Sequence, residues 1–194
     1  MVKKQKSKWL VPVLVVAGIL LVLVLGYISI YNSLVKMNES VNNQWAQVET
    51  QYQRRVDLIP NLVSTVEGAK NFEKSTLTEI TTLRSQWQTA STVNEKVNTA
   101  NQLESAISKL LVISENYPDL KSNQNFLALQ DELANTENKV AVERGRYNTA
   151  VRDFNAKIKT FPSNMVAGNL GYTDRDYFQA TTPGAENAPV ISFS

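Results

Sequence analysis

A long run without charge lies near the start of this chain, and it limits more than any other feature how the chain can fold. No charged residue occurs from Trp9 to Val35, and residues 9–28 are nearly all Leu, Val and Ile. About 20 such residues in a helix span about 30 Å, the thickness of the hydrocarbon core of a bilayer. The sequence therefore predicts a transmembrane helix over residues 9–30.

Five positions in this predicted span have features typical of membrane helices. Pro12 falls in the first turn, where its missing N–H costs little. Trp9 and Tyr27 lie at the two ends, where amphipathic rings suit the membrane interfaces. Gly18 and Gly26 can allow close helix contact, although their spacing is not the GxxxG pattern. We expect all five to be membrane-embedded.

The charges that flank the run predict its orientation. Four lysines precede Trp9 within the basic segment 1–8, namely Lys3, Lys4, Lys6 and Lys8, whereas Lys36 alone follows closely. Positive flanks stay on the cytoplasmic side, so we expect a cytoplasmic N-terminus with the bulk of the chain outside. A cleaved secretory signal is the alternative, but the run exceeds the usual apolar length of such signals and lacks a clean small-x-small site after it.

The composition excludes several classes of function. The chain has 20 basic and 18 acidic residues, and four of the basic ones precede the span, so the remainder is slightly acidic and no nucleic-acid surface is expected. There are no cysteines and no histidines, which removes the usual zinc ligands, the commonest nucleophile pairs and the commonest general base. We expect no metal, no cofactor and no catalytic residues. A hydrolase that uses only carboxylates is the weakest alternative.

The first soluble helix is predicted to continue from the membrane helix and to pass through a proline. No Gly or Pro occurs between Tyr27 and Ile59, so nothing local ends the helix. Apolar residues recur at spacings of three, four and four, an 11-residue pattern: Leu34, Met37, Val41, Trp45, Val48, Tyr52, Val56, Ile59 and Val63. Because the pattern keeps its phase across Pro60, we expect a kink there, with the freed Val56 carbonyl satisfied by Arg55 or by a partner helix. The alternative is a separate helix that begins at Pro60.

The rest of the chain indicates three further helices and a tail. The first covers roughly 71–87, the second begins at a Ser91 or Thr92 cap and ends at Pro118, and the third has an apolar stripe from Phe126 to Phe161. Residues 181–194 read as a flexible tail, with a weak strand signal at 190–193. Helices with single apolar stripes must bury them against one another. The predicted fold is all-α: a transmembrane helix that continues into an elongated antiparallel bundle over 31–180, kinked near Pro60. A slender bundle favours lateral association between copies.

Arg54, Arg55 and Asp57 form the most notable charged group, next to Pro60. Paired guanidinium groups bind carboxylates and phosphates, so this group is a candidate interaction site for an anionic partner. The structural alternative is a salt bridge from either arginine to a carboxylate of the last long helix, such as Asp131, Glu132 or Glu137.

Other polar and aromatic positions have structural explanations. Thr136 is expected to face inward within the polar run 135–139, which predicts a small hydrogen-bond network that fixes helix register. The aromatic residues on the helical stripes are expected to belong to the core rather than to a ligand cage: Trp45, Trp87, Tyr147 and Phe154.

Three stretches of this chain closely resemble the bacterial LemA family: RRVDLIPNLVSTV (54–66), the long motif at 117–164, and GYTDRDYF (171–178). The likeness extends from the membrane segment almost to the C-terminus. It implies one N-terminal membrane helix followed by a helical bundle in a bacterial envelope protein, and it carries over no catalytic or ligand residues. Relatives have been predicted with the N-terminus outside, whereas the lysines of this chain favour the cytoplasmic side.

These features favour a non-enzymatic, single-pass protein of the bacterial plasma membrane that acts as an interaction or scaffold module. Its expected partners are the lipid bilayer, further copies of itself and another envelope protein. The alternative is a regulatory or sensor subunit that couples binding at the kinked first helix to the membrane.

Overall fold

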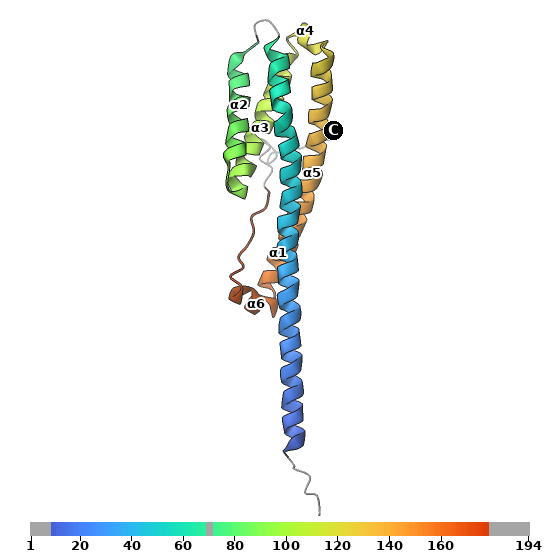
Figure 1. Cartoon of the computed structure of the whole chain (residues 1–194), viewed down its shortest axis with the longest axis vertical. Helices are drawn as coiled ribbons and strands as arrows, with labels where there is room; N and C mark the ends of the chain where they lie inside the picture. Colours follow the sequence, from blue (N-terminus) through green and yellow to red (C-terminus); the bar gives the residue numbers. More distant parts are fainter. Residues whose placement is uncertain (1–8, 69–71, 179–194) are drawn as a thin grey trace, which may run out of the picture. The chain divides into compact units, whose positions relative to one another are not determined.

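The computed structural model of the chain describes residues 9–68 and 72–178. Within these residues it contains helices and no strands, so the all-α prediction is confirmed. The expectations for the basic segment 1–8, the tail 181–194 and the possible strand at 190–193 lie outside the described residues. Figure 1 shows the helices α1 (Leu10–Glu67), α2 (Lys74–Thr89), α3 (Val93–Ser114), α4 (Pro118–Lys121), α5 (Gln124–Lys159) and α6 (Ser163–Asn169).

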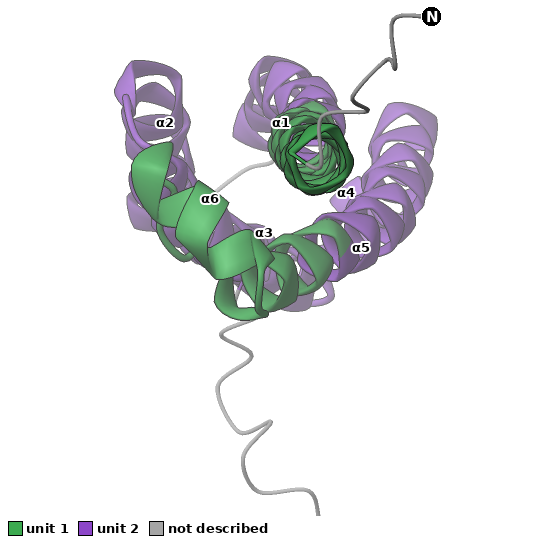
Figure 2. Ribbon diagram, turned by 90° about the horizontal axis from the view of Figure 1, so that it is seen from below, with its two compact units in different colours: residues 1–43, 150–175 green, residues 44–149, 176–194 purple. Residues whose placement is uncertain are grey.

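The described residues form two compact units, which have different colours in Figure 2. Unit 1 comprises residues 9–43 and 150–175. Unit 2 comprises residues 44–68, 72–149 and 176–178. Two of the three divisions fall inside helices, because α1 and α5 each contribute to both units, and the third falls between residues 175 and 176, after α6.

The long helix α1 is uninterrupted over 58 residues and contains Pro60. The alternative of a new helix that begins at Pro60 is therefore wrong. Before the proline the expected stripe is buried, since Val56 and Ile59 are at most 1% exposed. After it the buried positions are Leu62 and Val66, whereas the predicted Val63 is half-buried. Packing of this apolar face explains why the helix continues where one backbone hydrogen bond is missing.

In unit 2, α1, α2, α3 and α5 run in alternating directions (Figure 1), as expected for an antiparallel bundle. The α2 helix packs against α3 and buries one apolar face: Leu77, Ile80, Leu83 and Trp87. Thr92 is the N-cap of α3, and it forms a capping box with Glu95. The two side chains satisfy backbone N–H groups that the first turn leaves free, which fixes the start of the helix.

Unit 1 joins the end of α5 and the segment after α6 to the first part of α1. Asn155 exchanges two hydrogen bonds of 2.9 Å with the backbone of Arg175. The Arg175 guanidinium in turn donates to Asn38 Oδ1 of α1 at 2.8 Å. The Phe154 ring packs edge-on against Tyr172, with ring centroids 5.5 Å apart. These contacts hold the segment after α6 against two helices.

Three local expectations near the helix ends need correction. Pro118 ends the predicted helix but also begins the short helix α4, because proline suits the first helical position. Residues 163–169, for which no helix was predicted, form α6, which buries Ser163, Val166 and Ala167. Phe161, the last member of the predicted stripe, lies beyond the end of α5 and is 78% exposed.

Candidate functional site

Among the described residues, one helix has a segment that is long and apolar enough to cross a membrane, and this helix is α1. Residues 9–29 are all exposed, and none of the most apolar window is buried against the rest of the chain. Trp9 is 78% exposed and Tyr27 46%, and a Cβ atom built on Gly18 or Gly26 would meet no other atom within 4 Å. Pro12 is the third residue of the helix. An apolar surface of this length that faces outward all round is typical of a helix with lipid as its environment.

The carbonyl that Pro60 leaves free has a donor on a neighbouring helix. Proline has no N–H, so the carbonyl oxygen of Val56 loses its bond to position 60 within α1. Arg84 Nε of α2 donates to this oxygen at 3.3 Å. The sequence analysis left two donors open for the Val56 carbonyl, Arg55 or a partner helix, and the donor belongs to the partner helix α2.

Arg54 and Arg55 both reach carboxylates of α5, as in the structural alternative. Arg54 pairs with Glu132 at 2.6 Å on the surface, where its side chain is 54% exposed. Arg55 is 2% exposed and lies 3.4 Å from Glu137, whose side chain is 61% exposed. Asp57 accepts a hydrogen bond of 2.7 Å from Gln53 on the same helix. The charges beside Pro60 are thus held by partners within unit 2.

An open groove of about 620 Å³ follows the outer face of α1 in unit 2. It is lined by Ala46, Glu49, Thr50, Gln53, Arg54, Asp57 and Leu58. Two lining charges form ion pairs with neighbouring helices, since Glu49 pairs with Lys96 of α3 and Arg54 pairs with Glu132 of α5. Both of these lining charges are therefore already fixed in position by neighbouring helices.

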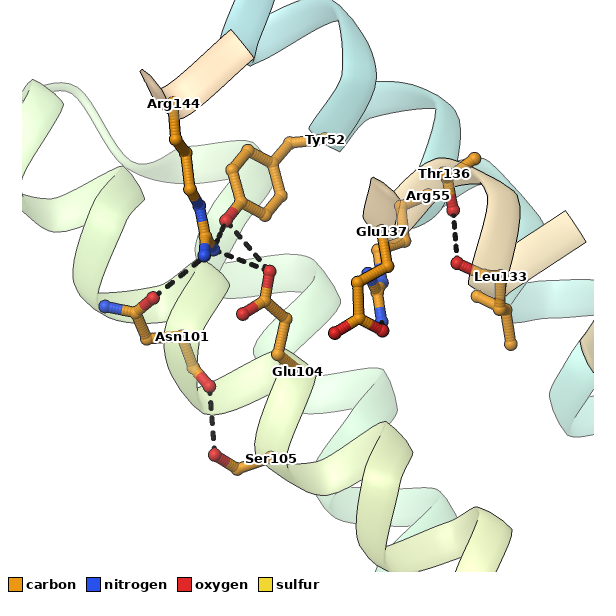
Figure 3. A network of polar contacts seen from close by, with 9 residues as sticks. All are labelled: Tyr52, Arg55, Asn101, Glu104, Ser105, Leu133, Thr136, Glu137 and Arg144. Carbon is orange, nitrogen blue, oxygen red and sulfur yellow. Dashed lines mark hydrogen bonds and ion pairs between the residues drawn. The ribbon is translucent and has the colours of Figure 1, made fainter. Parts of the chain in front are cut away.

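A part-buried polar cluster links α1, α3 and α5 inside unit 2, and Figure 3 shows its side chains pointing toward one another. Arg144 Nη2 of α5 donates to Glu104 Oε1 of α3 at 2.6 Å and also to the Tyr52 hydroxyl of α1. The same Tyr52 hydroxyl donates to Glu104 Oε1 at 3.0 Å. Asn101 Oδ1 lies 3.5 Å from Arg144 Nη2. Three helices are thus joined at one guanidinium.

Aromatic rings enclose the Arg144 guanidinium. The Tyr52 and Phe178 rings stack with their centroids 6.2 Å apart and their planes within 9°. The guanidinium carbon lies 4.3 Å from the Phe178 centroid and 5.4 Å from the Tyr52 centroid. Phe178 is itself fixed through its backbone, which exchanges two hydrogen bonds with Asn148. Cation–π contacts of this kind stabilise a charge that burial would otherwise disfavour.

Burial changes the protonation equilibria of this cluster. It raises the pKa of Glu104 from its ordinary 4.5 to about 7, while the positive charge of Arg55 acts in the opposite direction and Glu137 adds to the rise. Burial also lowers the pKa of Arg144 to about 10. Both shifts have the same cause, since a group removed from water loses hydration that its charged form needs most.

The sequence prediction located the polar core only in part. Thr136 is fully buried as expected, but its hydroxyl donates to the Leu133 carbonyl of its own helix at 2.9 Å, which is a bond within one helix. The cross-helix contacts come instead from Arg144, an apparent interruption of the apolar stripe, and from Glu104, which sequence reasoning missed. A charged residue within the stripe from Phe126 to Phe161, as at Arg144, is the signal that could have indicated this cluster.

In the described part of the chain, no three His, Cys, Asp or Glu side chains lie close enough together to hold a metal ion. The contacts of Glu104 are to a guanidinium and a phenol, which hold the carboxyl in one position. The aromatic side chains Trp87, Tyr147 and Phe154 are at most 4% exposed and so form core, as predicted. Trp45 is half-buried, and its ring packs edge-on against Tyr147 with the centroids 5.6 Å apart.

The fold and these sites define a class: a membrane-associated, all-helical protein in which an exposed apolar helix continues into a bundle with a polar cluster at its centre. The chain belongs to the LemA family, whose sequence model matches residues 44–193. The matched region begins after the apolar run and includes every residue of the cluster.

Relatives of this chain include proteins from two kinds of bacteria. It is 29% identical over 156 residues to Protein LemA of Metamycoplasma hominis, with 80% of this chain and 71% of the relative aligned. It is 23% identical to Magnetosome protein MamQ 1 and to Magnetosome protein MamQ 2 of Paramagnetospirillum magneticum, with 84% of this chain and 68% of each relative aligned.

Proposed function

We propose that this protein is a non-enzymatic, single-pass protein of the bacterial plasma membrane that acts as an interaction or scaffold module of the envelope and associates with copies of itself. The N-terminus is on the cytoplasmic side and the bundle is outside, as the four lysines before Trp9 favour. The bilayer, further copies of the chain and another envelope protein are the partners in this proposal.

The observation that carries the proposal is the open groove on the outer face of α1. Its lining residues Ala46 and Thr50 are small, exposed and one helical turn apart, so the backbone of another helix can approach closely there. The flanking charges Glu49 and Arg54 are already paired, so contact with a neighbour leaves neither charge without a partner. We infer that two copies meet along this face, related by a twofold axis that brings the same residues together.

Cysteine cross-linking tests this proposal directly, because the chain contains no native cysteine. Thr50→Cys lies in the groove, and Asn138→Cys on an exposed position of α5 outside it serves as the matched control. We expect oxidation in native membranes to give a disulfide-linked dimer with Thr50→Cys and monomer with Asn138→Cys. A strictly monomeric chain in both variants, with no envelope partner captured at position 50, contradicts the proposal.

A second candidate function is that of a regulatory or sensor subunit, and the contact at Pro60 favours it. The bond from Arg84 to Val56 is the point where α2 holds α1 next to the proline, close to Arg54, Arg55 and Asp57. Binding of an anionic partner to these charges would change that contact and bend α1 differently. If Pro60→Ala left self-association, partner binding and every cellular phenotype unchanged, the sensor function would lose its support.

A further inference from the structure

Two apolar side chains of unit 1 are strongly exposed next to α6. Phe161 is 78% exposed, as much as Trp9 at the start of the predicted span, and Met165 is 65% exposed. Single exposed apolar residues are normal on protein surfaces. These two lie four residues apart, one in the turn before α6 and the other in the first turn of α6.

The position of this turn along α1 is set within unit 1. Residues 9–29 of α1 are exposed, Ile30 is half-buried and Leu34 is fully buried, so the rest of the unit begins to cover α1 between Ile30 and Leu34. Figure 1 shows α6 and the end of α5 at the height of the blue part of α1. The exposed apolar run of α1 extends away from unit 1 at this level.

This height corresponds to the headgroup layer of a bilayer. When the apolar run over 9–28 spans the hydrocarbon core, Ile30 lies about 3 Å beyond its boundary and Leu34 about 9 Å, because a helix rises 1.5 Å per residue. The headgroup layer is about 5 to 7 Å thick on each side. The lowest side chains of unit 1 therefore face lipid headgroups rather than bulk water.

We propose that the turn from Phe161 to Met165 is a second membrane contact, in which both side chains insert into the interface of the bilayer that α1 crosses. An aromatic ring and a thioether gain free energy on leaving water, and aromatic rings are favoured at the interface. The last turn of α5 carries Lys157, whose long side chain can reach phosphate groups, and Lys159, which pairs with Asp174 at 2.5 Å. Lysines also suit a helix C-terminus without lipid, so the two apolar side chains carry the proposal.

A second contact fixes unit 1 at two points on the bilayer surface. One helix alone is free to rotate about its own axis and to tilt, whereas a helix and a turn beside it define one orientation. This inference depends on α1 spanning the membrane, but it does not depend on self-association or on the groove.

Site-directed spin labelling of the full chain tests the proposal. Phe161→Cys and Met165→Cys carry a nitroxide in vesicles of phosphatidylcholine and phosphatidylglycerol, and collision with oxygen and with a water-soluble nickel chelate reports depth. Labels at Leu20→Cys, Tyr27→Cys and Glu39→Cys provide a depth scale along α1, and the label at position 20 tests the span itself. We expect the labels at 161 and 165 to lie between Tyr27 and Glu39 in depth, with reduced access to nickel and increased access to oxygen relative to Glu39.

Three outcomes would overturn the inference. The first is nickel access at both positions equal to that at Glu39, which places the turn in water. The second is shielding from both reagents in vesicles and detergent micelles alike, which indicates contact with protein. The third is an unchanged depth of the Met165→Cys label when Phe161→Asp is added, because a carboxylate at the interface should lift the turn into water whereas Phe161→Leu should not.

Discussion

The Arg84 side chain of α2 donates from Nε to the backbone carbonyl oxygen of Val56 in α1, at a distance of 3.3 Å. This oxygen is the one that Pro60 leaves without a donor inside α1. The proline and the arginine therefore form one structural unit, although they are on different helices and 24 positions apart in the chain. A buried carbonyl without a donor costs free energy, so the bond from Arg84 offsets part of the cost of a proline at position 60.

Replacement of Arg84 by Met should destabilise the chain by about 1 to 2 kcal/mol, because the Val56 carbonyl then has no donor. In a Pro60→Ala background the same replacement should cost much less, since the alanine N–H at position 60 restores the bond to Val56 within α1. Denaturant unfolding of the unmodified chain, the two single variants and the double variant in detergent micelles gives the coupling energy between positions 60 and 84. Additive effects of the two substitutions would show that the contact contributes nothing beyond its separate parts.

Local periodicity was sufficient to predict the long helices α1, α2, α3 and α5 and most of their buried faces. The apolar stripe keeps its spacing across Pro60, and this predicted that α1 continues, because residues on one face of a single helix share one environment. The ion pairs of Arg54 with Glu132 and of Arg55 with Glu137 were among the partners considered, because neighbouring helices in a bundle bring opposite charges into reach. What periodicity establishes is which face a side chain occupies.

Periodicity does not establish which side chains meet across the interior. Glu104 is adjacent to the buried face of α3, but its contacts to Tyr52 and Arg144 involve positions 52 and 40 residues away. The relative register of three helices decides that contact, and no local pattern reports it. Likewise α6 is a short helix that contains a glycine and two asparagines, so its helical state depends on the burial of Val166 and Ala167 rather than on propensity.

The Glu104→Gln variant should change how stability depends on pH. The pKa of Glu104 is raised in the folded chain from 4.5 to about 7, so the folded state holds this proton more tightly than the unfolded state. Its contribution to stability is complete below pH 4.5 and is lost as the pH rises through about 7. A tenfold change in proton affinity corresponds to about 1.4 kcal/mol, so the loss is a few kcal/mol at most.

Glutamine keeps an oxygen that accepts from Arg144 and Tyr52 but does not ionise. The difference in unfolding free energy between Glu104→Gln and the unmodified chain should therefore shift in favour of the variant between pH 4.5 and about 7. Denaturant titrations across this range measure the difference, and Glu132→Gln on the surface is the matched control. A difference that stays constant with pH would mean that Glu104 is ionised at its ordinary pKa in the folded chain.

Removal of Glu137 should cost more than removal of its buried partner Arg55. Arg55 is 2% exposed, and its Nε and Nη1 atoms have no hydrogen-bond partner among the described residues. Glu137→Ala takes away the carboxylate that pairs with Arg55 and should destabilise the chain by about 1 to 3 kcal/mol. Arg55→Met leaves an exposed carboxylate in water and an apolar side chain in the core, so its effect should stay within about 1 kcal/mol.

The double variant Arg55→Met with Glu137→Ala separates this explanation from simple loss of packing. It should recover most of the stability that Glu137→Ala loses, because position 55 then carries no buried charge that lacks a partner. Unfolding by denaturant in micelles provides the comparison. If Glu137→Ala proved harmless while Arg55→Met unfolded the chain, the arginine would be a required part of the core rather than a tolerated charge.

Orientation in the membrane should follow the lysines that precede the span. In intact cells made permeable only in their outer layers, a membrane-impermeant maleimide should modify Glu39→Cys and leave Lys6→Cys unmodified until the cells are lysed, because positive flanks stay on the cytoplasmic side. Replacement of Lys3, Lys4, Lys6 and Lys8 by Gln removes the bias and should increase the fraction with the opposite pattern. Reaction of Lys6→Cys in intact cells would establish the inverse orientation, and a membrane-free chain that has lost position 6 would establish cleavage of a secretory signal instead of an anchor.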